Sequence, residues 1–92
     1  MSDEEFKDYW LTTHAPIAAD GYEHLTGYLV SLVTRVPEGQ EKPYDGIATL
    51  EWDDREGFRA DMSGEVAKES TDDLANFTSS FGLLFVEEHP VK

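Results

Sequence analysis

Bulky residues recur at three- and four-residue steps near the start of the chain, and they form one stripe of a helix: Phe6, Tyr9, Trp10, Thr13 and Ile17. This spacing predicts a helix over residues 3–13 with one buried face. The segment Ser2-Asp3-Glu4-Glu5 has the form of a capping box that would start this helix. The segment His14-Ala15-Pro16 is expected to end it, because proline disfavours helical dihedral angles in the residue before it.

Alternating apolar residues predict three strands further along the chain. Residues 25–34 and 46–52 flank a polar loop with glycine and prolines, which is typical of an antiparallel hairpin. Residues 81–88, which contain Phe81, Leu83 and Phe85, are expected to form the last strand.

Two further helical segments are expected between the hairpin and the last strand. Asp53 or Asp54 can cap a helix that carries Phe58 and Met62 on its inner face. Gly64 permits a break before a second helical piece over residues 65–76.

The predicted strands are apolar on both faces. In the first strand, Tyr28 and Val30 point to one side and Leu29 and Val33 to the other. The helices of one small α+β chain can shield only one face of its sheet, so the other face needs a separate cover. We therefore expect a homodimer whose sheets pack face to face.

Length and composition indicate one globular domain over residues 1–92. The chain is 39% hydrophobic, has no cysteine and carries a formal charge of −13. No apolar run is long enough for a membrane span or signal peptide, and a charge this negative disfavours nucleic-acid partners. Because salt screens repulsion between carboxylates, we expect a protein of a halophilic cytoplasm; an acidic protein of an ordinary cytoplasm is the alternative.

Several motifs in order resemble the EthD family, namely Phe6-x-x-Tyr9-Trp10-x-x-x-His14-Ala15-Pro16, Leu25-Thr26-Gly27-Tyr28, Tyr44-Asp45-Gly46-Ile47-Ala48, Trp52-Asp53-Asp54, Asn76-Phe77 and Leu84-Phe85-Val86-Glu87-Glu88. The resemblance runs from Met1 to Glu88. It implies a ferredoxin-like protomer of a dimeric α+β barrel. It also implies chemistry similar to that of isomerases, cyclases and dehydratases acting on lactones or polyketide-like compounds, although some members of the family have no known reaction.

The chain departs from the family at its start. EthD-like proteins have an apolar strand before their first helix, whereas that helix begins at Ser2 in this chain. In a ferredoxin-like sheet this N-terminal strand is central, so its absence would leave residues 46–52 and 81–88 without the partner between them. We expect the natural chain to begin upstream of Met1.

His14 is the candidate catalytic residue, because a neutral imidazole can take up or release a proton near neutral pH. The alternative is a histidine that only caps a helix C-terminus. In EthD-like proteins the corresponding histidine is thought to face the ligand cleft, which favours a role in catalysis.

Aromatic residues could line a pocket for a flat or cyclic ligand, and the candidates are Tyr9, Trp10, Tyr28 and Trp52. Such residues are more often part of a core. His24 and His89 are expected at the surface, as are the carboxylate pairs Asp72-Asp73 and Glu87-Glu88. The spacing of the three histidines predicts no metal site, and no cofactor motif occurs.

Two classes of function follow. The first is a cofactor-independent enzyme in which His14 moves a proton on a small hydrophobic or cyclic molecule. The second is a non-catalytic module that uses the same cleft to hold a ligand or docks a partner through the dimer face.

Overall fold

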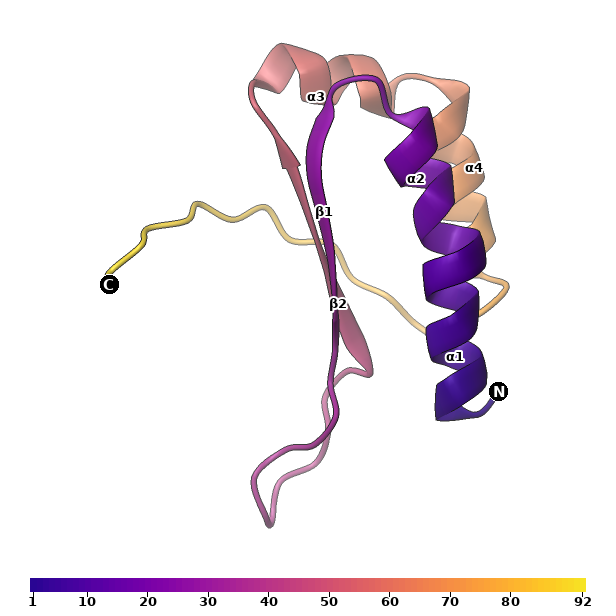
Figure 1. The fold of residues 1–92 in the computed structure, drawn as a ribbon, viewed down its shortest axis with the longest axis vertical. Coiled ribbons are helices and arrows are strands. Elements are labelled where there is room, and N and C mark those ends of the chain that lie inside the picture. The colour runs from indigo at the N-terminus through magenta and orange to yellow at the C-terminus, as the bar shows by residue number, and fades with distance from the viewer.

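The computed structural model describes residues 1–92 as a helical layer beside a two-stranded sheet (Figure 1). The elements are α1 (Asp3–Tyr9), η1 (Trp10–His14), α2 (Ala15–Gly21), β1 (Leu25–Leu32), β2 (Gly46–Trp52), α3 (Arg55–Met62) and α4 (Glu65–Leu74). The architecture is α+β, as predicted. The combined helix α1–η1–α2 runs alongside α4, and both lie on the same side of the hairpin.

The first helix starts as predicted but does not end at Pro16. Ser2 Oγ accepts a hydrogen bond from the Glu5 amide at 3.1 Å, and Glu5 Oε1 accepts one from the Ser2 amide at 3.0 Å. The chain then remains helical to Gly21 through the π-helical turn η1, where the Ala15 amide bonds to the Trp10 carbonyl. Proline lacks an amide hydrogen and crowds the carbonyl four residues before it, and a wider turn accommodates both effects. His14 therefore stands in mid-helix, which overturns its interpretation as a C-terminal cap.

Strands β1 and β2 form the predicted antiparallel hairpin, with a register that runs from Leu25 opposite Trp52 to Leu32 opposite Gly46. Tyr28 lies on the face toward the helices, where Trp10 reaches it. On the opposite face Leu29 and Ile47 are 62% and 54% exposed. The outer face of the sheet thus has no cover within this chain.

Helices α3 and α4 begin where the sequence predicts. Asp54 caps α3 by accepting a hydrogen bond from the Gly57 amide at 2.7 Å, and Gly64 is the N-cap of α4. Phe58 faces inward and contacts the Trp52 ring at a centroid distance of 5.0 Å. The prediction that Met62 also faces inward is wrong, because Met62 is 37% exposed. The buried residue in this turn of α3 is Asp61.

The expected last strand does not form. Residues 79–92 have no regular secondary structure, and Figure 1 shows this segment leaving the body of the molecule. A strand exists only by pairing with a neighbour, and the sheet of this chain pairs only β1 with β2. Apolar side chains in this segment remain exposed, including Phe81, Leu83, Leu84 and Val86. Phe85 contacts Phe58 at 5.8 Å between ring centroids.

The core is small and lies between the first helix, the sheet and the residues that follow α4. Its buried apolar residues are Trp10, Ala18 and Phe77. Phe6 and Tyr9 complete an aromatic cluster around Phe77, with ring centroids 5.6 and 5.1 Å from it. None of the helices is long and apolar enough to cross a membrane.

Candidate functional site

His14 and Asp73 form a buried pair that joins η1 to the last turn of α4. Nδ1 of His14 lies 2.8 Å from Oδ2 of Asp73, and the two side chains are only 7% and 12% exposed. An ionised carboxylate can only accept hydrogen bonds, so Nδ1 carries the proton in this pair. The lone pair of the neutral ring is therefore on Nε2.

Nε2 of His14 has no hydrogen-bond partner in the protein. No fully buried side-chain nitrogen or oxygen is left without a partner, so Nε2 still touches space that solvent can reach. An imidazole held at Nδ1 by a carboxylate and free at Nε2 is the arrangement of a general base.

Asp73 is the centre of a wider hydrogen-bond network. Its Oδ1 accepts from the Tyr9 hydroxyl at 2.7 Å and from Asn76 Nδ2 at 3.0 Å. Burial alone would raise the pKa of Asp73, but the hydrogen bonds from Asn76, Tyr9 and His14 together hold that pKa below its ordinary value. The bond to Asp73 in turn raises the pKa of the Tyr9 phenol. Asp73 is thus a fixed carboxylate near neutral pH.

The prediction that Asp73 belongs to a solvated acidic pair is wrong, although its neighbour Asp72 is exposed. Asp73 falls on the inward stripe of α4 and the following turn, with Val66, Ser70 and Phe77 at helical spacing. An acidic residue on an otherwise inward stripe was the signal that could have revealed it.

Trp10 links the first helix to the sheet. Its Nε1 donates to the Tyr28 hydroxyl oxygen at 3.3 Å. The Phe77 ring contacts both Trp10, at 6.0 Å between centroids, and His14, at 4.7 Å. Three of the five predicted site residues, Tyr9, Trp10 and His14, therefore contact Phe77. The fourth, Tyr28, is joined to them through Trp10.

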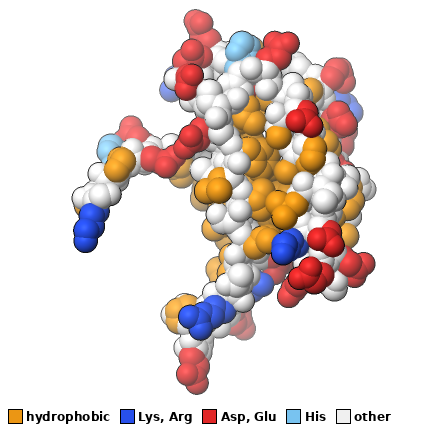
Figure 2. Space-filling model, viewed as in Figure 1, with side chains coloured by type: hydrophobic (Ala, Val, Ile, Leu, Met, Phe, Trp, Pro, Cys, Tyr) orange, Lys and Arg blue, Asp and Glu red, His pale blue; other side chains and the backbone are white.

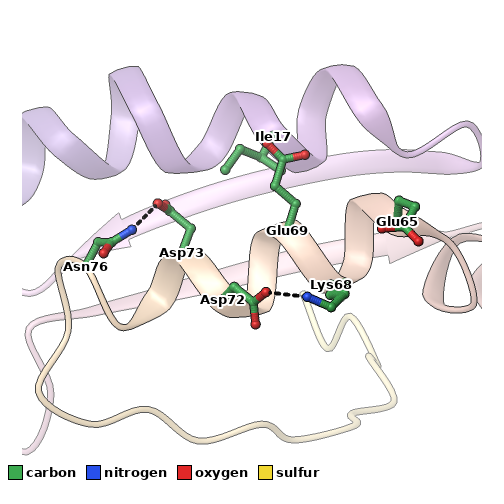
Figure 3. A pocket seen from close by; sticks show the side chains of 7 residues that line it. All are labelled: Ile17, Glu65, Lys68, Glu69, Asp72, Asp73 and Asn76. Atoms are coloured by element: carbon green, nitrogen blue, oxygen red, sulfur yellow. Dashed lines mark hydrogen bonds and ion pairs between the residues drawn. The ribbon is translucent and has the colours of Figure 1, made fainter.

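An open groove of about 420 Å³ lies on the outer side of this network (Figure 3). Its lining residues come from α2, α4 and the turn after α4, and they are Ile17, Glu65, Lys68, Glu69, Asp72, Asp73 and Asn76. Lys68 pairs with Asp72 at 2.9 Å. No group of three or more histidine, cysteine, aspartate or glutamate side chains is arranged so that it could hold a metal ion.

Comparison with known proteins identifies the family. The model of the EthD domain matches residues 1–80. The chain belongs to the EthD family. No curated protein matches it. Its fold is similar to the crystal structure of an EthD family protein from Bacillus halodurans, with a TM-score of 0.76 and 22% identity. That match covers 97% of this chain and 87% of the Bacillus chain.

In this EthD domain, Trp52 belongs to a different cluster from His14. Its Nε1 donates to Oδ2 of the buried Asp61 at 2.8 Å, and the His24 amide donates to the same oxygen at 3.0 Å. The Tyr22 ring contacts Trp52 at 5.8 Å. Asp61, which sequence reasoning missed, thus fastens α3 to the end of β2 and to the turn before β1.

The other two histidines of the EthD domain are exposed, as predicted. The side chain of His24 is at the surface, and His89 pairs with Glu87 at 2.6 Å in the C-terminal segment. His14 is therefore the single buried histidine of the chain.

Proposed function

We propose that this EthD family protein is a cofactor-independent acid–base catalyst that acts on a small hydrophobic or cyclic molecule. The reaction is of the isomerase, cyclase or dehydratase type. The observation that supports the proposal is the His14–Asp73 pair, in which Nδ1 is held at 2.8 Å and Nε2 has no protein partner. His14 takes a proton from the substrate through Nε2 and returns it at another atom, so the ring is regenerated in each turnover.

Asp73 has two roles in this scheme. It holds the imidazole in the tautomer that can accept a proton at Nε2, and its negative charge stabilises the imidazolium that then forms. The formal charge of −13 repels anionic molecules, so the proposal favours an uncharged substrate.

Turnover of a panel of lactones and polyketide-like ketones tests this function. In the His14→Ala variant that remains folded, we expect turnover to fall by about a hundredfold to ten-thousandfold while ligand affinity stays nearly constant, because the proton acceptor is lost. Trp10→Phe should instead weaken affinity with a smaller effect on turnover. His24→Ala is the matched control, since that histidine is exposed. Equal turnover in His14→Ala and wild type would contradict the proposal.

The second candidate function is a non-catalytic binding or accessory module. The observation in its favour is that the His14 side chain is only 7% exposed and joins η1 to α4, as a purely structural histidine would. On this alternative no compound of the panel is converted, and His14→Ala lowers stability without changing ligand affinity in the variant that remains folded.

We also propose that the protein is a homodimer of a halophilic cytoplasm. The exposed side chains of Leu29 and Ile47 on the outer face of the sheet support a dimer, because isolated proteins seldom leave such a face uncovered. The apolar segment 81–86 adds to the surface that a second copy would cover. The excess of acidic residues supports adaptation to salt.

Sedimentation equilibrium in dilute buffer and in molar KCl tests the dimer. We expect twice the chain mass at high salt, and we expect Leu29→Glu to raise the dimer dissociation constant by about a hundredfold, because a charge would be buried in an apolar interface. Leu11→Glu is the control, since Leu11 is an exposed leucine of the helical layer. A monomer at both salt concentrations would refute the dimer.

A further inference from the structure

The hydroxyl proton of Tyr28 has no acceptor in this chain. Trp10 Nε1 donates to the Tyr28 oxygen, so that bond uses a lone pair and leaves the phenol proton available. Tyr9 differs, because its hydroxyl proton is given to Asp73. Because Tyr28 is half-buried, a ligand carbonyl that reaches its hydroxyl can accept this proton in place of water.

Tyr28 faces the helices through its hydrogen bond with Trp10, and Trp10 and His14 are both buried residues of the first helix. Trp10 and His14 are four residues apart, so their side chains follow one another along one helix face. Trp10 reaches Tyr28, and both Trp10 and His14 contact the Phe77 ring. Figure 2 shows hydrophobic side chains gathered along the seam between the strands and the helices on the face in view.

We propose that Tyr28 is the oxygen-binding residue of this site and that the substrate is an uncharged carbonyl compound with a hydrogen on the carbon next to the carbonyl. This inference rests on the proposed function of His14 as the proton acceptor. Tyr28 binds the carbonyl oxygen, and His14 Nε2 faces the adjacent carbon.

The reaction step balances without any added reagent. The proton of the adjacent C–H bond moves to Nε2 of His14, and the electron pair of that bond forms a carbon–carbon double bond. The carbonyl π electrons move onto oxygen, where the hydrogen bond from Tyr28 stabilises the enolate. In a simple ketone the proton returns from Nε2 to the same carbon, which gives hydrogen exchange and restores the neutral ring. In a substrate with a further carbon–carbon double bond conjugated to the enolate, the proton returns to the far carbon of that system and completes an isomerisation.

The surroundings of Tyr28 suit a donor rather than a phenolate. Burial raises the pKa of Tyr28 above its ordinary value, although the hydrogen bond from Trp10 lowers it in part. The phenol therefore keeps its proton near neutral pH. Trp10 is a positioning residue here, because its indole N–H fixes the phenol oxygen without contacting the substrate carbonyl.

Exchange of the activated hydrogens of β-tetralone in deuterium oxide tests the proposal by proton NMR. We expect wild-type protein to accelerate exchange over buffer, and Tyr28→Phe to slow the catalysed rate by about a hundredfold, as removal of an oxyanion donor does. Trp10→Phe should give a smaller loss, and His14→Gln should remove the catalysed rate. Tyr44→Phe should match wild type, because Tyr44 is an exposed tyrosine.

Binding provides a second measurement that needs no turnover. Wild-type protein should bind β-tetralone at least about tenfold more tightly than tetralin, which lacks the carbonyl, and Tyr28→Phe should remove that preference. Thermal unfolding of each variant verifies that the fold is intact. If Tyr28→Phe keeps both the exchange rate and the preference while His14→Gln loses exchange, the role of Tyr28 is wrong and the proposed function stands. If wild-type protein neither exchanges β-tetralone nor prefers it to tetralin, the carbonyl substrate is refuted.

Discussion

Asparagine in place of Asp73 should stop proton transfer by His14 while leaving most of the fold in place. Oδ1 of Asp73 accepts hydrogen bonds from both Tyr9 and Asn76, so the amide oxygen of the variant will occupy that position. The amide NH₂ group then faces Nδ1 of His14 and donates to it. The ring proton must move to Nε2, which can no longer accept a proton from a substrate.

Imidazole nitrogen NMR measures this change directly. Wild-type protein should show the tautomer protonated at Nδ1, and Asp73→Asn the tautomer protonated at Nε2. Turnover should fall by about a thousandfold to ten-thousandfold, as in other dyads that lose the carboxylate. Asp72→Asn is the matched control, since Asp72 is exposed and pairs only with Lys68. An unchanged tautomer in Asp73→Asn would show that the carboxylate does not orient the ring.

Asp73→Asn should also change how the stability of the protein depends on pH. The pKa of Asp73 is lower in the folded protein than the ordinary value of an unfolded aspartate, about 3.9. The ionised carboxylate therefore stabilises the fold fully above that value, and this stabilisation is lost as the pH falls through the lower, folded pKa. Unfolding measured by circular dichroism should show a shallower acid slope in Asp73→Asn than in wild type or Asp72→Asn.

Alanine at Gly46 should destabilise the protein by about 3 kcal/mol, the upper range for overpacking of a core. A Cβ atom at this position would overlap Cζ3 of the Trp10 ring and lie 3.0 Å from its Cη2 atom. The carbonyl oxygen of Ser31 lies 3.3 Å from the same Cβ position, so the added methyl group cannot shift toward this backbone to avoid the ring. The buried indole must therefore shift, and its hydrogen bond to Tyr28 is expected to break.

Urea unfolding followed by tryptophan fluorescence measures this loss. Gly82→Ala is the control, because a Cβ atom there would meet nothing within 4 Å. Trp10→Phe removes the ring atoms that collide, so Gly46→Ala should cost less in that background than in wild type. Equal costs in the two backgrounds would mean that the clash with Trp10 is not the cause.

Local features were predictable because their causes are close together in sequence. The capping box at Ser2 and Glu5, the Asp54 cap and the turn residues between β1 and β2 each act over a few residues. The aromatic stripe likewise identified Tyr9 and Trp10 as inward-facing. Thr13 of the same stripe is exposed, because the π-helical turn changes the helical spacing at that point.

The sequence by itself determined the hairpin, the starts of α1, α3 and α4, and His14 as the residue to test, since short-range capping, turn geometry and side-chain chemistry decide these. Only the tertiary structure decided that Asp73 holds His14, because the two residues are 59 positions apart and no local pattern links them. It also decided that residues 81–88 do not form a strand, because a strand depends on a neighbouring edge rather than on its own alternation. The geometry of the His14–Asp73 pair thus depends on a contact that packing of α4 against the first helix creates.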